Sequence, residues 1–493
     1  MKRFWIFLLL FPLLGGCHKP GSDDSQLDEQ TLKTRYYVNM FGFNVMSAYY
    51  LWCDEIAPEL KAWKTDEEPI EKVKTIRYKN AAGEDIDRWT MLTDDYESFI
   101  GNVSGVYKTA GLDFVLYYAD SSRKNVVGVV TYTYSGSPAE KAGLHRGDVF
   151  TKVNGTEMTA DNYAGLINDG IYGNAPFQLT LNNGASVSLT PVTMTEDAVN
   201  EALVLESGGK KVGYLHYTSF TLLSLDRLMK TFADFKAEGI DELVLDLRYN
   251  GGGYVKTCTV LGSLLAPLDA VNAGSVFTRE IYNARLTEAW GEEPNCFQAD
   301  FGEVAVATGV KVSCPAARNN CDLQRVYVLV SASSASASES LICGLKPYMD
   351  VVVIGKQTHG KYCGGLPFSA TEWFDAVKDQ MEDGMYEKAQ PYIGNWGIYV
   401  MYSRYADCNG LTLSMPDGIV PDVELGDDPL DGYMLGDPRE TMLAAALAQM
   451  TPGVISSPPA ARTRAIASDL AIPTPEALRR PGFGVLLGDC PVR

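Results

Sequence analysis

Short apolar segments alternate with helical patterns between residues 200 and 450, and this alternation constrains the fold more than any other feature. The strand-like segments are Val212–Tyr217, Leu243–Leu247, Val326–Val330 and Val351–Ile354, and a helical pattern lies between Leu223 and Ala237. Buried strands that alternate with amphipathic helices are typical of an α/β core. The sequence therefore predicts an α/β core over residues 196–450.

Three of these strand-like segments end in turns with unusual composition. The first turn, Asp246-Leu247-Arg248-Tyr249-Asn250-Gly251-Gly252-Gly253, runs into three consecutive glycines. Glycine allows positive φ and close approach of the backbone, and such a turn can present free amides to an anion. Taken alone, this turn suits a plain strand-to-helix connection or a phosphate site equally well.

The second turn is rich in serine and alanine and follows the strand that ends at Val330. It reads Ser331-Ala332-Ser333-Ser334-Ala335-Ser336-Ala337-Ser338-Glu339, and a helical pattern follows it. Small residues between a strand and a helix allow a nucleophile and backbone amides to face one point, where the helix N-terminus favours negative charge. The alternative is a serine-alanine linker, which seldom separates a buried strand from an amphipathic helix.

The third turn, Lys356-Gln357-Thr358-His359-Gly360-Lys361, follows the strand that ends at Gly355. Lys361 lies 25 residues after Ser336, an interval that one helix and one strand would fill, so both side chains are expected at the same sheet edge. A serine hydroxyl needs a base, and a lysine serves only when burial lowers its pKa from about 10.4 to roughly 7–8. A Ser-His-Asp triad that uses His359 or His216 is the competing hypothesis.

Residues 104–195 form a separate β-rich segment. The stretch from Gly136 to Asp148, which contains Ser-Pro-Ala, Ala-Gly-Leu and Gly-Asp, resembles a bacterial PDZ domain. PDZ domains add a peptide to a sheet edge and hold its carboxylate on loop amides. The expected peptide-binding loop contains Gly111, Leu112, Asp113 and Phe114. Because the Asp113 carboxylate would repel a bound chain end, strand addition is better supported than recognition of a free C-terminus.

Together the three turns resemble the C-terminal processing peptidases, or tail-specific proteases. The resemblance implies a ClpP/crotonase-like core in which Ser336 is the nucleophile and Lys361 is the general base, and it assigns oxyanion-hole amides to Gly252 and Ala337. The family's closing signature is matched by Gly418-Ile419-Val420-Pro421-Asp422.

Two positions depart from the family pattern. Pro347 stands where many members have aspartate, and Gly365 stands where many have a glutamine that orients the lysine. Tyr362 or another residue must therefore orient Lys361.

The chain begins with a targeting pattern. Lys2 and Arg3 precede an apolar run, and Leu14-Gly15-Gly16-Cys17 resembles the lipobox of bacterial lipoproteins. The pattern predicts a signal peptide at residues 1–16, lipidation of Cys17 and a tether at residues 17–28; an ordinary signal peptide is the alternative. A helical region is expected over residues 29–103, and a weakly ordered tail rich in Pro, Ala and Arg over residues 451–493.

Charge and cysteine usage narrow the function classes. The net charge of −20 disfavours nucleic acid as a partner. Export permits disulfides, and Cys314 with Cys321 is the expected pair. With four histidines and no Cys-x-x-Cys motif, the sequence gives no support for a zinc site, and the chemistry requires no cofactor.

The combined prediction is an α/β multidomain serine endopeptidase that is lipid-anchored in the bacterial cell envelope, at the outer membrane, on the periplasmic or surface face. Its partners would be protein or peptide substrates and, through the anchor, the membrane. The alternative is a catalytically degenerate, peptide-binding PDZ lipoprotein.

Overall fold

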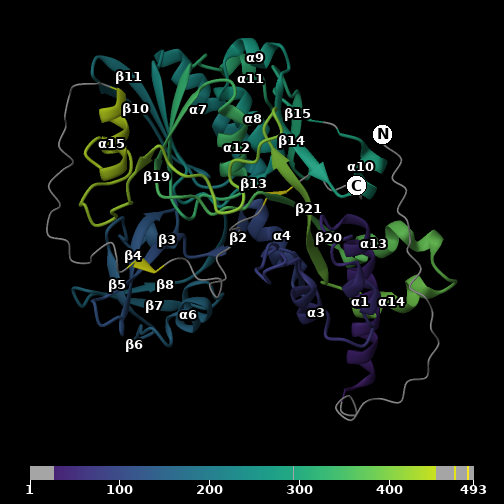
Figure 1. The fold of residues 1–493 in the computed structure, drawn as a ribbon. Coiled ribbons are helices and arrows are strands. Elements are labelled where there is room, and N and C mark those ends of the chain that lie inside the picture. The colour runs from purple at the N-terminus through teal and green to yellow at the C-terminus, as the bar shows by residue number, and fades with distance from the viewer. Residues whose placement is uncertain (1–26, 293, 451–470, 473–485, 488–493) are drawn as a thin grey trace.

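The computed structural model describes residues 27–292, 294–450, 471–472 and 486–487. In Figure 1 a β-rich unit lies at the lower left, an α/β core lies above it, and the N-terminal helices lie at the right. The fold class predicted from the sequence is confirmed, namely a mixed α/β chain with a helical N-terminal region, a β-rich unit where the PDZ domain is expected and an α/β core.

The central sheet of the core has six strands in the order β10-β11-β12-β18-β19-β22. Only β10 is antiparallel to its neighbour, and the other strands are parallel. The strands are β10 (Val199–Ser207), β11 (Lys210–Tyr217), β12 (Glu242–Asp246), β18 (Arg325–Val330), β19 (Asp350–Gly355) and β22 (Val423–Glu424). The inner strands read as continuous apolar runs because both faces of the sheet are covered.

Helices cover the two faces of this sheet. Alternate residues of β12 and β18, such as Leu245 and Val328, face the main apolar cluster, while Val244 and Leu329 face a smaller one. The first face packs against α7 (Leu225–Glu238), α8 (Val255–Leu265) and α12 (Ala337–Leu345), and the second against α15 (Thr441–Met450). The same main cluster includes α9 (Leu268–Asn272), α10 (Ala284–Trp290) and α11 (Ala316–Asn319).

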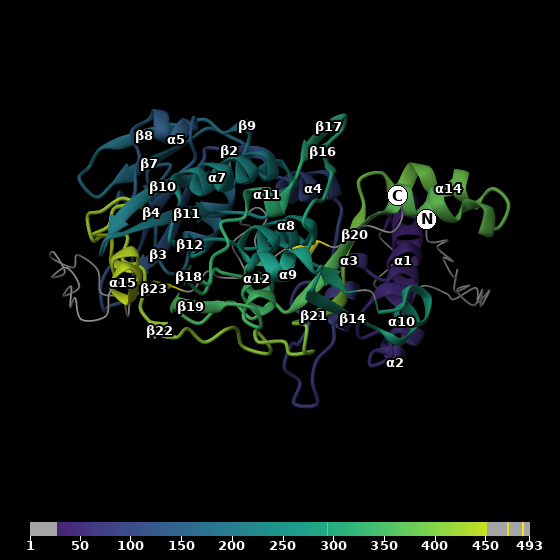
Figure 2. The same ribbon diagram turned by 90° about the horizontal axis from the view of Figure 1, so that it is seen from above.

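The N-terminal helices share the apolar core of the α/β region. The elements are α1 (Glu29–Tyr49), α2 (Ala57–Ala62), α3 (Pro69–Ile76), β1 (Met91–Thr93) and α4 (Tyr96–Ser104). Helix α1 lies beside α13 (Ala370–Val377) and α14 (Met385–Ile393), as Figures 1 and 2 show. The Tyr37 and Tyr392 rings stack with centroids 5.6 Å apart, and Phe41 packs edge-on against Trp373 at 5.8 Å.

A second sheet of the core has the path β13-β24-β20-β21-β14-β15, and β1 pairs with β21. Its strands are β13 (Gly253–Tyr254), β24 (Leu486–Leu487), β20 (Cys363–Ser369), β21 (Gly397–Ala406), β14 (Val276–Tyr282) and β15 (Asn295–Cys296). A separate hairpin consists of β16 (Glu303–Ala307) and β17 (Val310–Ser313). Strand β13 begins in the triple-glycine turn, and β20 follows the loop that contains Lys361. Both segments therefore lead into this second sheet.

The PDZ domain has its own sheet and its own apolar cluster. The sheet order is β23-β3-β4-β5-β7-β8, with β6 paired to β5, and β2 pairs with β9 at the two ends of the domain. The elements are β2 (Val106–Thr109), β3 (Leu112–Tyr118), β4 (Val126–Thr133), α5 (Pro138–Lys141), β5 (Val149–Val153), β6 (Thr156–Glu157), α6 (Tyr163–Leu166), β7 (Phe177–Leu181), β8 (Ser186–Leu189), β9 (Val192–Thr195) and β23 (Ala471–Ile472).

The structure corrects the expected disulfide. Cys314 and Cys321 are both free thiols. Their sulfur atoms face different groups, since Cys314 Sγ lies 3.6 Å from the Val312 carbonyl and Cys321 Sγ lies 3.9 Å from the Phe232 carbonyl. Helix α11 fills the loop between the two cysteines and anchors it to the core instead.

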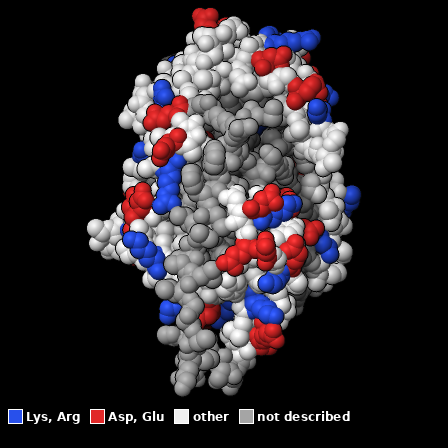
Figure 3. All heavy atoms as spheres, turned by 90° about the vertical axis from the view of Figure 1, so that its right-hand side faces the viewer, with Lys and Arg blue, Asp and Glu red and all other residues white. Residues whose placement is uncertain are grey.

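The two ends of the chain lie mostly outside the described residues, and these include the signal peptide, Cys17 and most of the tether and tail. Within the expected tail, however, β23 and β24 are paired strands. The helices that the structure describes include none that could cross a membrane. On the face in Figure 3, basic side chains are interspersed with acidic ones, so charge of one sign does not gather there.

Candidate active site

The three turns with unusual composition meet at one edge of the central sheet. They follow β12, β18 and β19, which are adjacent and parallel, so their carboxyl ends lie side by side. The carbonyl of Asn250 in the glycine turn accepts hydrogen bonds from the Ala335 amide (3.1 Å) and the Ser338 hydroxyl (3.0 Å). The glycine turn and the serine turn are therefore locked together.

Ser336 differs from the serines on either side of it. Ser334 Oγ donates to the Leu247 carbonyl (2.8 Å) and Ser338 Oγ donates to the Asn250 carbonyl. The Ser336 hydroxyl is completely buried and has no hydrogen-bond partner among the described residues. Its backbone has φ +62° and ψ −110° directly before α12, a strained conformation of the kind that persists at functional sites. This geometry leaves one serine hydroxyl available for chemistry.

Glu339, in the first turn of α12, joins the serine turn to the lysine loop. Its carboxylate accepts hydrogen bonds from the amides of Ser336 (2.9 Å), Lys361 (2.9 Å) and Gly360 (2.7 Å), and from the Thr358 hydroxyl (2.5 Å). The Ser336 and Lys361 amides donate to the same oxygen, Glu339 Oε2, so their nitrogen atoms lie close together. Burial raises the pKa of Glu339, and these four donors oppose the rise.

Lys361 is completely buried, and its surroundings favour the neutral amine. Burial lowers its pKa to about 7, against the opposing effect of Asp87 and other nearby groups. Lys361 Nζ donates a hydrogen bond to the Tyr399 hydroxyl (3.0 Å), and it lies 5.0 Å from the centre of the Tyr399 ring and 5.6 Å from that of Trp89. A base with this pKa is largely deprotonated just above neutral pH.

The sequence analysis did not identify the residue that orients the lysine amine. In the structure, Tyr399 contacts this amine. Tyr362, which the sequence suggested for this role, forms no hydrogen bond with that amine in the described part of the chain. A Cβ atom at Gly365 would lie 2.3 Å from two atoms of the Tyr399 ring, so glycine at this position makes room for the tyrosine. The other departure, Pro347, is exposed beyond the end of α12 and lies outside the buried site.

Three contributors to this site were missed by the sequence analysis. Tyr399 lies on β21, and Trp89 lies on the segment before β1. Glu339 belongs to the serine turn, but the sequence predicted no function for it. Glycine in place of glutamine at position 365 was the one sequence signal that another residue orients Lys361. Nothing near Lys361 in the sequence pointed to Tyr399 or Trp89, which are 38 and 272 positions away from it.

The two predicted oxyanion donors differ in availability. The Ala337 amide is the first of α12 and has no acceptor among the described residues. The Gly252 amide donates to Asn250 Oδ1 (2.8 Å), so this bond must be exchanged before Gly252 could serve an oxyanion. Gly252 has φ +113°, which only glycine adopts readily.

Neither histidine of the triad hypothesis is hydrogen-bonded to Ser336. His216 is buried in β11, where its Nδ1 pairs with Asn200 Oδ1 (2.9 Å), and its pKa is lowered by burial to about 4. Burial also lowers the pKa of His359 to about 4, and its ring faces Trp89 with centroids 6.4 Å apart. Both rings are therefore neutral at physiological pH.

The predicted peptide-binding loop of the PDZ domain lies at the start of β3. Gly111 has φ +74°, and a Cβ there would lie 2.3 Å from Ser137 Cβ, which excludes other residues. Leu112 and Phe114 are buried in the PDZ apolar cluster. The Gly111 amide donates to Thr109 Oγ1 (3.0 Å), and Asp113, the second residue of β3, is buried.

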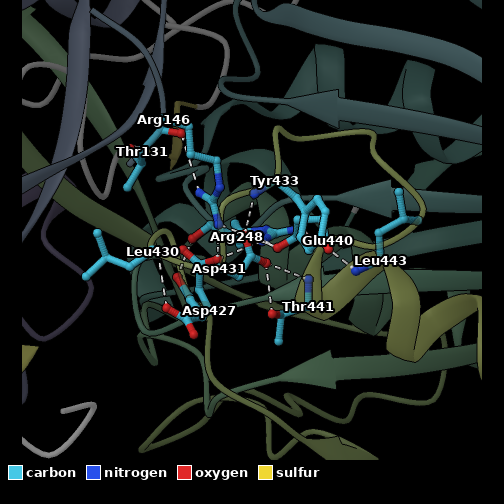
Figure 4. A network of polar contacts seen from close by, with 12 residues as sticks. Thr131, Arg146, Arg248, Asp427, Leu430, Asp431, Tyr433, Glu440, Thr441 and Leu443 are labelled. Atoms are coloured by element: carbon cyan, nitrogen blue, oxygen red, sulfur yellow. Dashed lines mark hydrogen bonds and ion pairs between the residues drawn. The ribbon is translucent and has the colours of Figure 1, made fainter. Parts of the chain in front are cut away.

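A buried charge network joins the PDZ domain to the core (Figure 4). Arg146 of the PDZ domain contacts Asp427 (2.6 Å) and the Tyr249 hydroxyl (2.7 Å), and Arg248 contacts Asp427 (2.8 Å) and Glu440 (2.7 Å). Burial acts to raise the pKa of Asp427, but the two guanidinium groups hold it well below its usual value. The network reaches the glycine turn directly, because Arg248 and Tyr249 belong to it.

No group of histidine, cysteine, aspartate and glutamate side chains in the described part of the chain has the arrangement of a metal site.

Comparisons with known proteins agree with this arrangement. Residues 211–425 match Peptidase family S41, and residues 129–170 match a PDZ domain. The “Probable CtpA-like serine protease” of Staphylococcus aureus (strain bovine RF122 / ET3-1) is 24% identical over 313 residues, which are 60% of this chain and 58% of that protein. The “C-terminal processing peptidase, chloroplastic” of Tetradesmus obliquus is 28% identical over 348 residues, 67% of this chain and 62% of that protein.

The chain thus spans little more than half the length of these curated relatives. A crystal structure described as “Putative S41 protease from Bacteroides fragilis” has the same fold, with a TM-score of 0.62 and 23% identity over 84% of this chain and 96% of that one. The family resemblance inferred from the three turns is confirmed. Over residues 211–425 the chain is therefore similar to serine-type peptidases of the S41 family, and over residues 129–170 it is similar to a PDZ domain.

Proposed function

We propose that the chain is a serine endopeptidase in which Ser336 is the nucleophile and Lys361 is the general base. The observation that carries this proposal is the pairing of a buried serine hydroxyl that has no hydrogen-bond partner with a buried lysine whose pKa is about 7. Both are held by the carboxylate of Glu339. A nucleophile and a base in one dry site are what acyl transfer requires.

The proposed reaction has two steps. Ser336 Oγ attacks the carbonyl carbon of the substrate while Lys361 Nζ takes its proton, and the negative charge on the carbonyl oxygen is stabilised by the Ala337 amide and, once released from Asn250, by the Gly252 amide. The amine product leaves with the proton from Lys361. Water then attacks the acyl carbon and gives a proton to Lys361; the bond from that carbon to Ser336 Oγ breaks, Lys361 returns the proton to Oγ, and the acid product leaves.

A serine-reactive fluorophosphonate probe and casein cleavage test this assignment. The wild type is expected to cleave casein and to carry the probe on Ser336. Ser336→Ala should lose both properties, and Ser333→Ala, in the same turn, should keep them. If Ser334→Ala or Ser338→Ala abolished labelling while Ser336→Ala retained it, the assignment would be wrong. A folded wild type with neither property would support the alternative, a degenerate peptide-binding protein.

We also propose that Cys17 carries a lipid that attaches the chain to the bacterial cell envelope. The support is the sequence Leu14-Gly15-Gly16-Cys17 after a basic and apolar leader. Lipid chains supply membrane affinity that the rest of the chain need not provide. After cell fractionation, the wild type should be found with membranes and Cys17→Ser in the soluble fraction. Equal membrane recovery of both proteins would contradict lipidation.

A further inference from the structure

The open edge of the PDZ sheet is occupied by the chain itself. Strand β3 pairs with β4 on one side, and on the other side it pairs with β23, which is antiparallel to it. Ala471 lies opposite Tyr117 and Ile472 lies opposite Leu116. PDZ domains bind peptides by adding a strand to an exposed edge. Figure 2 shows β23 beside β3, in the position of such an added strand.

The side chain of Ile472 contributes to this contact. It is partly buried and packs against the PDZ apolar cluster, which includes Leu112, Phe114 and Leu116. An apolar side chain that packs beneath an added strand gives such a contact its specificity. Pro473 follows Ile472 in the sequence, and a residue before proline prefers the extended conformation that an added strand needs.

A second strand from the same C-terminal segment lies beside the candidate active site. Leu486 and Leu487 form β24, which runs parallel to β13 and β20 and connects them in the sheet. Leu486 lies opposite Gly253, and Leu487 lies opposite Gly365. Strand β13 directly follows Gly252, and β20 begins two residues after Lys361. The strand is therefore flanked by the two segments that continue from the oxyanion turn and the lysine loop.

We propose that the C-terminal segment is an intramolecular ligand of both peptide-binding edges, and that substrates are extended peptides which replace it. The inference for β13 and β20 rests on the proposed protease function, whereas the inference for β3 does not. Because β23 precedes β24 in the sequence, a substrate that binds to the two edges in the same order places its PDZ-bound stretch on the amino-terminal side of the cleaved bond. Since β23 begins at residue 471 and β24 ends at residue 487, a peptide with its two binding stretches at the same spacing is about 17 residues long.

The PDZ loop supports recognition of an internal stretch rather than a chain end. The Gly111 amide already donates to Thr109 Oγ1, so it is not open to a carboxylate. Asp113 places a buried carboxyl group in the same loop, where a second carboxylate would be repelled. Binding then depends on backbone pairing with β3 and on the apolar side chain at the position of Ile472.

The first experiment measures peptide binding without catalysis. Two full-length proteins are titrated with a fluorescent, amidated peptide of residues 466–478. One carries Ser336→Ala alone, and the other carries both Ser336→Ala and Ile472→Asp. Because a tethered ligand competes at an effective concentration of about millimolar, Ile472→Asp should tighten binding of the added peptide about tenfold or more. Leu478→Asp, in the same segment but outside both strands, should leave the affinity unchanged.

Two results of this titration would overturn the proposal for β3. One is equal affinity of the added peptide with and without Ile472→Asp. The other is much tighter binding of a peptide that ends at Ile472 with a free carboxylate, which would indicate recognition of chain ends.

The second experiment measures turnover by the active chain. Leu487→Pro removes an amide from the paired strand and is expected to raise kcat/KM for a short fluorogenic peptide about tenfold, because the competing strand is displaced. Leu478→Pro serves as the control. An unchanged or lower kcat/KM for Leu487→Pro, with wild-type activity present, would refute occupancy of the catalytic edge, whereas absence of activity from every variant would instead refute the protease function.

The order of the two binding stretches is tested with a pair of long peptides. Both contain the same cleavable casein sequence, with Ala-Ile-Pro placed about 14 residues before it or after it. The first order should give the lower KM for the wild type, and a lower KM for the second order would contradict the proposed direction.

Discussion

At the scale of single residues, the chemistry depends on the proton affinity of Lys361. Its pKa is lowered to about 7 by burial, and only the neutral amine can accept the proton of Ser336. Activity is therefore expected to rise with pH through about 7. A histidine base with a pKa of about 4 would instead give full activity well below neutral pH.

Substitutions separate these two bases. Lys361→Arg and Lys361→Met should both lower kcat at least about 100-fold, because a guanidinium stays protonated and a thioether is no base. Lys356→Met is the matched control, since Lys356 is an exposed lysine of the same loop that pairs with Glu424. Kinetics between about pH 5 and 10 provide the measurement. The lysine base would be ruled out if Lys361→Arg kept substantial turnover. It would also be ruled out if His359→Ala lost turnover while the Lys361 variants kept it.

Tyr399 is expected to position the lysine amine. Tyr399→Phe keeps the ring beside Gly365 but removes the oxygen that accepts a hydrogen bond from Nζ. Because a small displacement of a catalytic group is costly, kcat should fall about 10- to 100-fold with little change in KM. The hydrogen bond to Tyr399 stabilises the charged amine, so its removal should lower the pKa of Lys361. The rising limb of the pH profile should therefore move to lower pH.

Tyr362→Phe is the control for this substitution, because Tyr362 is adjacent to Lys361 but forms no hydrogen bond with its amine. An unchanged pH profile for Tyr399→Phe, or equal effects of both substitutions, would contradict a positioning role.

At the scale of elements, a buried arginine of the PDZ domain contributes to its contact with the core. Arg146 leaves the loop before β5 and reaches Asp427, Glu440 and Tyr249. Replacing it with methionine removes one of the two guanidinium groups that pair with Asp427 and Glu440, and loss of one member of a buried ion pair costs about 3–5 kcal/mol. We expect Arg146→Met to lower the free energy of unfolding by about that amount in urea titrations.

Arg123→Met is a suitable comparison, because Arg123 is an exposed arginine of the same domain that only lies over the Tyr118 ring. It should change the free energy of unfolding by less than about 0.5 kcal/mol. Equal stability of both variants would show that the network does not hold the domains together.

At the scale of the whole molecule, buried neutral histidine makes the fold sensitive to acid. His216 is buried with a pKa of about 4, whereas in the unfolded chain its pKa is about 6.5. The unfolded state therefore binds more protons between these two values, and the free energy of unfolding falls as pH drops from about 6.5 to about 4. The contribution of this one group reaches about 3 kcal/mol.

Urea unfolding at several pH values measures this effect, and His216→Asn is the informative variant because it cannot titrate. The variant should lose less stability than the wild type between about pH 6.5 and 4, whatever its stability at pH 7. Parallel curves for the two proteins would contradict a neutral, buried His216 as the cause.

The amino-acid sequence by itself determined the local elements and the order of the chemical motifs. Strands β12, β18 and β19 lie where short apolar runs were found, because strand and helix periodicity depends on neighbours two to four residues apart. The turns after these strands carry Ser336 and Lys361 to one edge, because consecutive parallel strands in one sheet end on the same side. The sequence alone therefore indicates these two residues.

Only the tertiary structure decided which distant groups complete the site. Tyr399 and Trp89 reach Lys361 from segments 38 and 272 residues away in the sequence, and periodicity carries no information about such contacts. The same limit explains the incorrect disulfide between Cys314 and Cys321, whose proximity in sequence did not fix the direction of their side chains. It also explains the pairing of Ile472 with β3, since strand addition depends on an unpaired edge that forms only when the sheet has folded.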